Sequence, residues 1–185
     1  ALTRSGFAEG KLARSIVVLR PLMGVVLLAL GCSAALASDA ADRWRFGSAA
    51  DGVITASIYA DSMLVTGNGA LGYSPVLTIA CRPVGDPHWS EWLQLSDGVA
   101  ASDTITVAVT VDHGSSVREN WLVASNSMTL MHDGADAVSR LASAKRLRLS
   151  WRFGLITGRV DADFFLAGAA EAIDRLAAEC KIATP

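Results

Sequence analysis

The chain has 185 residues, of which 51% are hydrophobic and 18% charged, and its 16 Lys and Arg against 18 Asp and Glu give a net charge of −2. This hydrophobic content is too high for an intrinsically disordered chain. A nucleic-acid-binding surface needs a basic patch, whereas the basic residues at 145–152 alternate with apolar ones, which indicates a solvated strand face. We therefore exclude nucleic acid as a partner.

The N-terminal 37 residues have the pattern of a bacterial secretory signal peptide. Basic residues precede a short apolar stretch at residues 22–30, and small residues typical of a cleavage site end at Ala37. A transmembrane helix needs about 20 uninterrupted apolar residues, and Arg20 and Pro21 interrupt this run. We expect cleavage after Ala37 and localisation in the periplasm or outside the cell.

A second interpretation of the leader involves Cys32. The sequence Leu-Ala-Leu-Gly-Cys at residues 28–32 resembles the box at which bacterial lipoproteins are acylated on cysteine, although its small residues are only partly in place. Lipidation at Cys32 would anchor the chain to a membrane. This alternative stays open beside cleavage after Ala37.

The sequence predicts a linker over residues 38–52 and one domain over residues 53–185. Seven segments alternate apolar and polar residues or form short apolar runs between turn-forming residues, as strands do. They are residues 53–60, 75–81, 89–95, 104–112, 117–124, 146–153 and 159–166. Apolar residues at helical spacing predict a short helix over residues 134–144 and a C-terminal helix over residues 168–180.

This order of elements predicts an α+β fold. A parallel doubly wound sheet needs alternating strands and helices, whereas here most strands follow one another directly. We expect a curved antiparallel sheet of about six to seven strands, a short helix, and a C-terminal helix held to the sheet by a disulfide.

The disulfide is predicted from the cysteine count. Loss of the leader removes Cys32 and leaves Cys81 and Cys180, and two cysteines in an exported protein favour one bond. The bond closes a loop of about 100 residues, for which the chain-entropy model gives roughly 4.7 kcal/mol. A reactive thiol or a metal site is the alternative, but neither cysteine has a second Cys or a His at ligand spacing.

No motif in the domain predicts catalysis, a metal or a cofactor. The glycines at residues 67–72 match G-x-G-x-x-G, yet a strand follows them where a dinucleotide site needs a helix. The three histidines are far apart in predicted loops next to aspartates. Asp161 and Asp163 share one face of a strand, as acid/base pairs can, but a solvated edge strand explains them equally well. We assign no catalytic residue.

The hairpin before and within residues 89–95 is the predicted interaction surface. Trp89 and Trp92 are three residues apart, so a regular strand puts them on opposite faces and leaves one of them exposed. Exposed tryptophans often mark recognition surfaces. Together with Asp86 and His88 they form the candidate site for a partner.

Spaced residues across the domain carry a family resemblance. These are Pro-Val-Leu-Thr-Ile-Ala-Cys at residues 75–81, Trp-Leu-Val-Ala-Ser at residues 121–125, and the ending from Asp163 through the last helix to Cys180. The pattern resembles the exported VasI/TagO-like family associated with type VI secretion, over about residues 53–180. The chain departs from it where an Arg-x-Asp pair is usual, because Asp112 lacks the Arg.

The resemblance implies a periplasmic accessory protein without recognised catalytic residues, acting at the cell envelope with a protein partner. We expect a non-enzymatic accessory or binding protein that needs no cofactor and meets the membrane only if it is lipidated at Cys32. The alternatives are an inhibitor of an envelope-directed enzyme, as lysozyme inhibitors are, and a periplasmic hydrolase.

Overall fold

The structure is a computed structural model that describes residues 43–66, 69, 71–99, 102–152 and 158–185. The predicted leader, its cleavage site after Ala37 and Cys32 lie outside the described residues. In the part of the chain that is described, no helix has the length and apolar character needed to cross a membrane.

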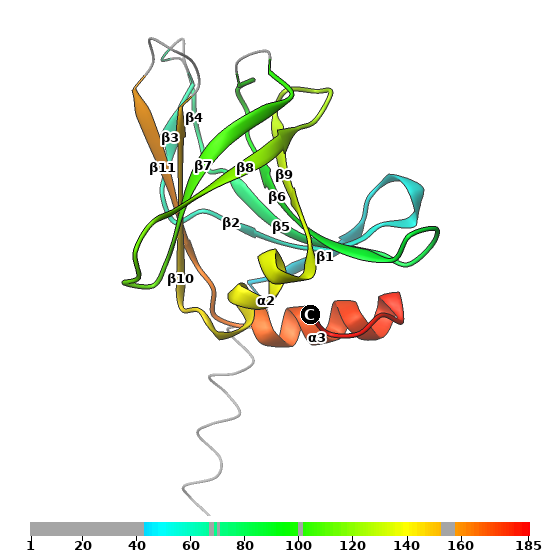
Figure 1. The fold of residues 1–185 in the computed structure, drawn as a ribbon. Coiled ribbons are helices and arrows are strands. Elements are labelled where there is room, and N and C mark those ends of the chain that lie inside the picture. Colours follow the sequence, from blue (N-terminus) through cyan, green and yellow to red (C-terminus); the bar gives the residue numbers. More distant parts are fainter. Residues whose placement is uncertain (1–42, 67–68, 70, 100–101, 153–157) are drawn as a thin grey trace, which may run out of the picture.

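Within the described residues, nine strands form one antiparallel sheet that curls into a half-barrel (Figure 1). Each strand pairs with its neighbours in the spatial order β1-β2-β5-β6-β9-β8-β7-β10-β11. The strands in that order are β1 (Arg45–Ser48), β2 (Ile54–Tyr59), β5 (Val76–Arg82), β6 (His88–Gln94), β9 (Thr129–Asp133), β8 (Val117–Val123), β7 (Thr104–Val111), β10 (Arg146–Arg152) and β11 (Arg159–Phe165).

Short elements complete the described fold. A single turn of 3-10 helix, Ala50–Gly52, links β1 to β2, and β3 (Leu64–Val65) pairs with β4 (Gly72–Tyr73) as a separate ribbon. Helices α2 (Ala135–Ser143) and α3 (Ala169–Cys180) lie together at one end of the half-barrel (Figure 1).

The prediction of a curved antiparallel sheet with two late helices is confirmed, but its strand count was too low. The two additional strands of the main sheet are β1 and β9. β1 lies in the predicted linker, and Trp44 beside it is 3% exposed, with its indole Nε1 donating to the carbonyl oxygen of Ala167 at 3.1 Å. Both strands are short, and β1 has no fully buried residue, so neither carries the apolar alternation that identifies a strand.

The apolar core fills the concave side of the sheet. Leu147, Leu149 and Trp151 of β10 alternate with arginines, and all three are at most 1% exposed, as their spacing predicts. Burial of each such side chain contributes roughly 1.5–3 kcal/mol. The other large, fully buried side chains are Trp121, Phe164, Leu77, Ile79, Leu93, Leu130, Leu141, Leu166 and Ile173.

Helix α3 covers strands β2 and β5, and α2 packs on α3 and β6. α3 begins after Gly168, whose φ of 81° is a left-handed conformation that glycine adopts without a steric penalty. The predicted stripe of Ala169, Ile173, Leu176 and Cys180 is buried. The helix therefore brings Cys180 down onto the sheet.

Candidate functional site

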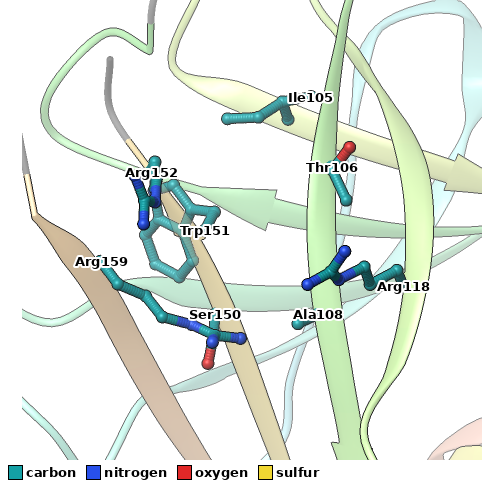
Figure 2. Close-up of a pocket in the computed structure, with 8 residues that line it drawn as sticks. All are labelled: Ile105, Thr106, Ala108, Arg118, Ser150, Trp151, Arg152 and Arg159. Atoms are coloured by element: carbon teal, nitrogen blue, oxygen red, sulfur yellow. The ribbon is translucent and has the colours of Figure 1, made fainter. Parts of the chain in front are cut away.

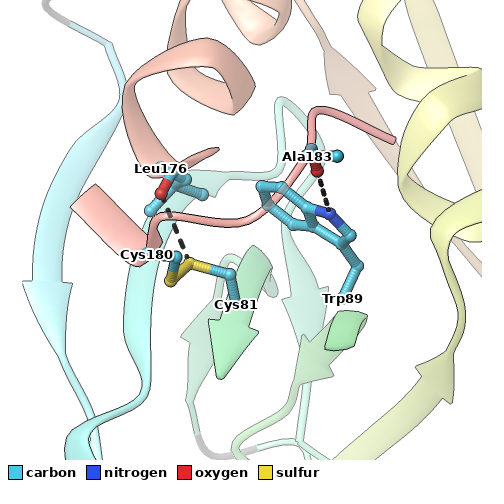
Figure 3. The surroundings of a disulfide bond; sticks show 5 residues. All are labelled: Cys81, Trp89, Leu176, Cys180 and Ala183. Atoms are coloured by element: carbon cyan, nitrogen blue, oxygen red, sulfur yellow. Dashed lines mark hydrogen bonds between the residues drawn. A yellow bond between two sulfur atoms is a disulfide. The ribbon is translucent and has the colours of Figure 1, made fainter. Parts of the chain in front are cut away.

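Cys81 and Cys180 form the predicted disulfide, which joins strand β5 to the last residue of α3 (Figure 3). Their Cα atoms are 6.4 Å apart across 99 residues of sequence, and both side chains are buried. The Cys81 sulfur also lies 3.5 Å from the carbonyl oxygen of Leu176. A disulfide sulfur has no proton, so this is a packing contact and not a hydrogen bond.

The structure separates the four residues of the predicted interaction surface. Asp86 is exposed in the turn before β6, and its carbonyl oxygen lies 2.6 Å from Nδ1 of half-buried His88. Trp89 and Trp92 lie on opposite faces of β6, because Trp89 pairs with core residue Cys81 while Trp92 pairs with Thr78.

The burial of Trp89 removes it from that surface. Its side chain is 4% exposed, and its indole Nε1 donates to the carbonyl oxygen of Ala183 at 3.0 Å, which fixes the C-terminal tail against the sheet (Figure 3). Trp92 is half-buried on the convex face. A role of Asp86, His88 and Trp92 in partner binding stays a prediction.

A charged cluster that sequence analysis did not single out lies on the concave side of the sheet. We call it the interior charge cluster, and its five members come from β6, β8, β9 and α2. The members are Glu91, Glu119, Trp121, His132 and Arg140. Strand register builds it, because Glu91 pairs with Ile79 on one side and His132 on the other, and Glu119 pairs with Val107.

Arg140 holds the two carboxylates of the interior charge cluster with one guanidinium group. Its Nη2 donates to Glu91 Oε2 at 2.5 Å, and its Nη1 donates to Glu119 Oε1. The planar guanidinium suits such a fork because its donors point in fixed directions. Since Arg140 belongs to α2, these bonds fix that helix to β6 and β8 at once.

Trp121 and His132 complete the interior charge cluster. The Trp121 indole Nε1 donates to Glu119 Oε2 at 3.1 Å, and His132 Nδ1 lies 3.6 Å from the same oxygen. The two rings stack with centroids 5.6 Å apart and an interplanar angle of 13°. Each Glu119 oxygen therefore has a cationic or polar neighbour.

Burial dominates the electrostatics of Glu91. Its side chain is 0% exposed, and Oε1 has no hydrogen-bond partner among the described residues. Loss of hydration raises the pKa of Glu91 to about 7, although Arg140 opposes the rise. Burial also acts to lower the pKa of Arg140, but Glu91 and Glu119 outweigh it, so Arg140 stays charged.

The bonds of the interior charge cluster hold α2 to the sheet, and the burial of Glu91 argues against a role of that carboxyl as a general acid or base. A substrate must reach a general acid or base within hydrogen-bond distance, whereas the Glu91 carboxyl is covered and already bonded to Arg140. Among the described residues, no group of three His, Cys, Asp or Glu side chains is placed to hold a metal ion.

A hollow of about 450 Å³ opens on the other side of the sheet, between β7 and β10. Figure 2 shows the two strands parting above Ala108 and Ser150, the last pair that joins them. We call it the arginine hollow. Its lining residues are Ile105, Thr106, Ala108, Arg118, Ser150, Trp151, Arg152 and Arg159.

Of the three arginines that line the hollow, the sequence places two close together and leaves the third distant. Arg152 and Arg159 end two predicted neighbouring strands, and they pair directly across β10 and β11. Arg118 comes from β8, two strands away, and pairs with Ala108 of β7. Its approach depends on the order of strands in the sheet, which no local pattern predicts.

No protein-family model and no curated protein matches the chain. Among solved structures, the chain is similar to invasion associated protein B from Bartonella henselae, with a TM-score of 0.50 and 17% sequence identity. The match covers 75% of this chain and 94% of that chain. At this identity the likeness shows the fold alone. Membership of the VasI/TagO-like family stays a prediction.

Proposed function

We propose that the protein is an exported, non-enzymatic binding protein of the bacterial cell envelope, which acts through a protein partner in the periplasm. The observation that carries this proposal is the buried disulfide between Cys81 and Cys180. Structural disulfides persist in oxidising compartments such as the periplasm and are rare in the cytosol. The predicted signal peptide supports the same compartment.

The sites of the fold favour binding over catalysis. The carboxylates of the interior charge cluster are engaged by Arg140, and Glu91 is closed to substrate. The convex face is accessible, and it carries both Trp92 and the arginine hollow. An invasion-associated protein shares the fold, which is compatible with a role at the cell envelope. An association with type VI secretion is the narrower form of the proposal, and it rests on the family resemblance.

Export is tested by fusing residues 1–45 to a reporter enzyme that is active only in the periplasm. We expect activity, and a fusion from residue 38 onward, which lacks the leader, should be inactive. The proposed location would be overturned if both fusions were inactive and the reporter protein stayed in the cytoplasm.

The absence of catalysis is tested with the purified full domain on peptidoglycan, alone and together with lysozyme. We expect no release of soluble fragments by the protein alone. Release of fragments would overturn the non-enzymatic proposal, and protection against lysozyme would replace the accessory role by the inhibitor alternative.

In vivo cross-linking from an introduced photoreactive residue at Trp92, with Glu171 on α3 as the control position, then asks whether the convex face meets a protein. A partner captured equally from both positions would contradict a convex-face interface.

A further inference from the structure

The arginine hollow gathers positive charge on the surface of an otherwise acidic chain. Arg118, Arg152 and Arg159 reach it from three different strands, and all three are exposed. Arg118 and Arg159 point toward one another across Ser150 and Ala108 (Figure 2). Guanidinium groups that converge in this way repel one another unless an anion lies between them.

The arginines of this hollow are poorly neutralised by the protein itself. Among the described residues, Arg118 and Arg152 form no ion pair, and the nearest acidic contact of Arg159 is a 3.9 Å approach of its Nε to Asp161 Oδ1.

The arginines of a second hollow differ from those of the arginine hollow in their ion pairing. Two of the second hollow's three arginines are matched by aspartates, with Arg43 bonded to Asp61 at 3.0 Å and Arg148 bonded to Asp163 at 2.7 Å. Neutralised arginines of that kind are an ordinary surface feature. The arginine hollow differs because, among the described residues, none of its three arginines has an acidic partner closer than 3.9 Å.

The floor of the arginine hollow leaves room for a ligand. Ala108 and Ser150 are small, and both are 7% exposed at the last pair between β7 and β10. The Ser150 hydroxyl adds a hydrogen-bond donor beside the guanidinium groups. Two guanidinium groups that face one another from different strands, with a third lining the same hollow, match an anion with three or more acceptor oxygens better than a carboxylate with two.

We propose that the arginine hollow is a binding site for a phosphate or sulfate oxyanion, held by Arg118, Arg152 and Arg159 over the floor of Ala108 and Ser150. The oxyanion belongs either to a small soluble molecule or to a lipid headgroup, which present the same chemistry to the hollow. The inference deepens the proposed function by naming a ligand class, but its test with inorganic ions does not depend on where the protein resides.

The first test measures binding of inorganic phosphate and sulfate by amide chemical shifts at constant ionic strength. We expect saturable shifts at residues of β7, β8, β10 and β11, and sodium chloride should not reproduce them. Arg118→Gln or Arg159→Gln should weaken affinity about tenfold, which corresponds to about 1.4 kcal/mol. Arg82→Gln is the control, because Arg82 is exposed at the end of β5 and makes the same change of charge.

Two results would overturn the proposal. One is the absence of saturable shifts with both ions in the wild-type protein. The other is equal weakening by Arg82→Gln and Arg118→Gln, which would indicate general charge attraction without a site. Because the three arginines are exposed, the variants should keep the wild-type melting temperature, and thermal unfolding checks this. Arg118→Lys should bind more weakly than wild type, since an ammonium group cannot form the paired bonds of a guanidinium.

A second arm separates the two sources of the oxyanion. Sedimentation with phosphatidylglycerol vesicles, against phosphatidylcholine vesicles of equal size, measures recognition of a headgroup. Loss of vesicle binding in Arg118→Gln but not in Arg82→Gln assigns the site to a lipid phosphate. Binding of inorganic phosphate without binding to vesicles assigns it to a soluble ligand. Failure of the export test with binding intact would overturn the proposed function and leave this site standing.

Discussion

Glu91 and Arg140 form an ion pair of unequal burial. The Glu91 side chain is completely buried, whereas the Arg140 side chain is 20% exposed. The pair joins the middle of the sheet to helix α2, and Arg140 extends it to Glu119. A buried charge is tolerated when its partner and hydrogen bonds are in place, and removal of one partner costs much more than the pair contributes.

Replacement of Arg140 by methionine should therefore destabilise the fold by about 3–5 kcal/mol. Glu91 and Glu119 would be left together without a cation. The measurement is the free energy of unfolding in urea, and the double variant Glu91→Met/Arg140→Met should recover part of the loss. Arg148→Met removes an exposed pair with Asp163 and should change stability by no more than about 1 kcal/mol. Equal effects of Arg140→Met and Arg148→Met would contradict a structural role of the cluster.

The raised pKa of Glu91 predicts a dependence of stability on pH. In the unfolded chain the carboxyl has its ordinary pKa of 4.5, and in the folded protein the pKa is about 7. Between these two pH values the folded protein binds the Glu91 proton more strongly than the unfolded chain does. The resulting contribution to the free energy of unfolding is fully present below pH 4.5 and is lost as the pH rises through about 7. The loss is roughly 3 kcal/mol at 1.36 kcal/mol per pKa unit.

Glu91→Gln removes this titration and should flatten the dependence. The difference in unfolding free energy between variant and wild type should move in favour of the variant as the pH increases from about 4.5 to 7. Glu171→Gln, an exposed carboxyl of α3, is the matched control and should show no such change across the window. A constant difference for Glu91→Gln would show that the carboxyl does not titrate there.

The disulfide predicts that the losses of stability from replacing its two cysteines are not additive. Cys81→Ser and Cys180→Ser should each lower the unfolding free energy by about 2–5 kcal/mol, and the double variant should lose little more than either one. Both changes break the same bond between β5 and α3. Thermal unfolding with and without reductant measures this, and clearly additive losses would mean that the two cysteines act separately.

Trp44 tests whether the region before β2 belongs to the core. Trp44→Ala should cost about 3–5 kcal/mol because it opens a cavity beside β1, and Trp44→Phe should cost about 1 kcal/mol through loss of the bond to Ala167. A neutral effect of Trp44→Ala would favour the linker that the sequence predicts for residues 38–52.

Structural features that depend on neighbouring residues could be predicted from the sequence, whereas contacts between residues far apart in the chain could not. The α2 and α3 boundaries and the buried face of β10 were predictable, because helical spacing and alternation are local signals. β1 was not, since it is four residues long at an edge and its burial pattern does not alternate. Asp161 and Asp163, which share a strand face, lie beside Arg159 and Arg148 as surface partners.

One member of the interior charge cluster, Glu91, could have been recognised from the sequence. Glu91 stands between Trp89 and Leu93 at the alternation of the buried face, so a carboxylate was placed where an apolar residue is normal. Its partner could not be predicted, because Arg140 lies 49 residues away on a helix. The arginine hollow likewise needs the order of strands before Arg118 meets Arg159.

The central claim is an exported binding domain held together by one disulfide. Its most direct test is the intact mass of the non-reduced protein, purified from the periplasm, with alkylation before and after reduction. The account predicts a mass that begins at Ser38, with two alkylated thiols appearing only after reduction. A species acylated at Cys32 would contradict cleavage after Ala37, and free Cys81 and Cys180 thiols without reductant would contradict the claim itself.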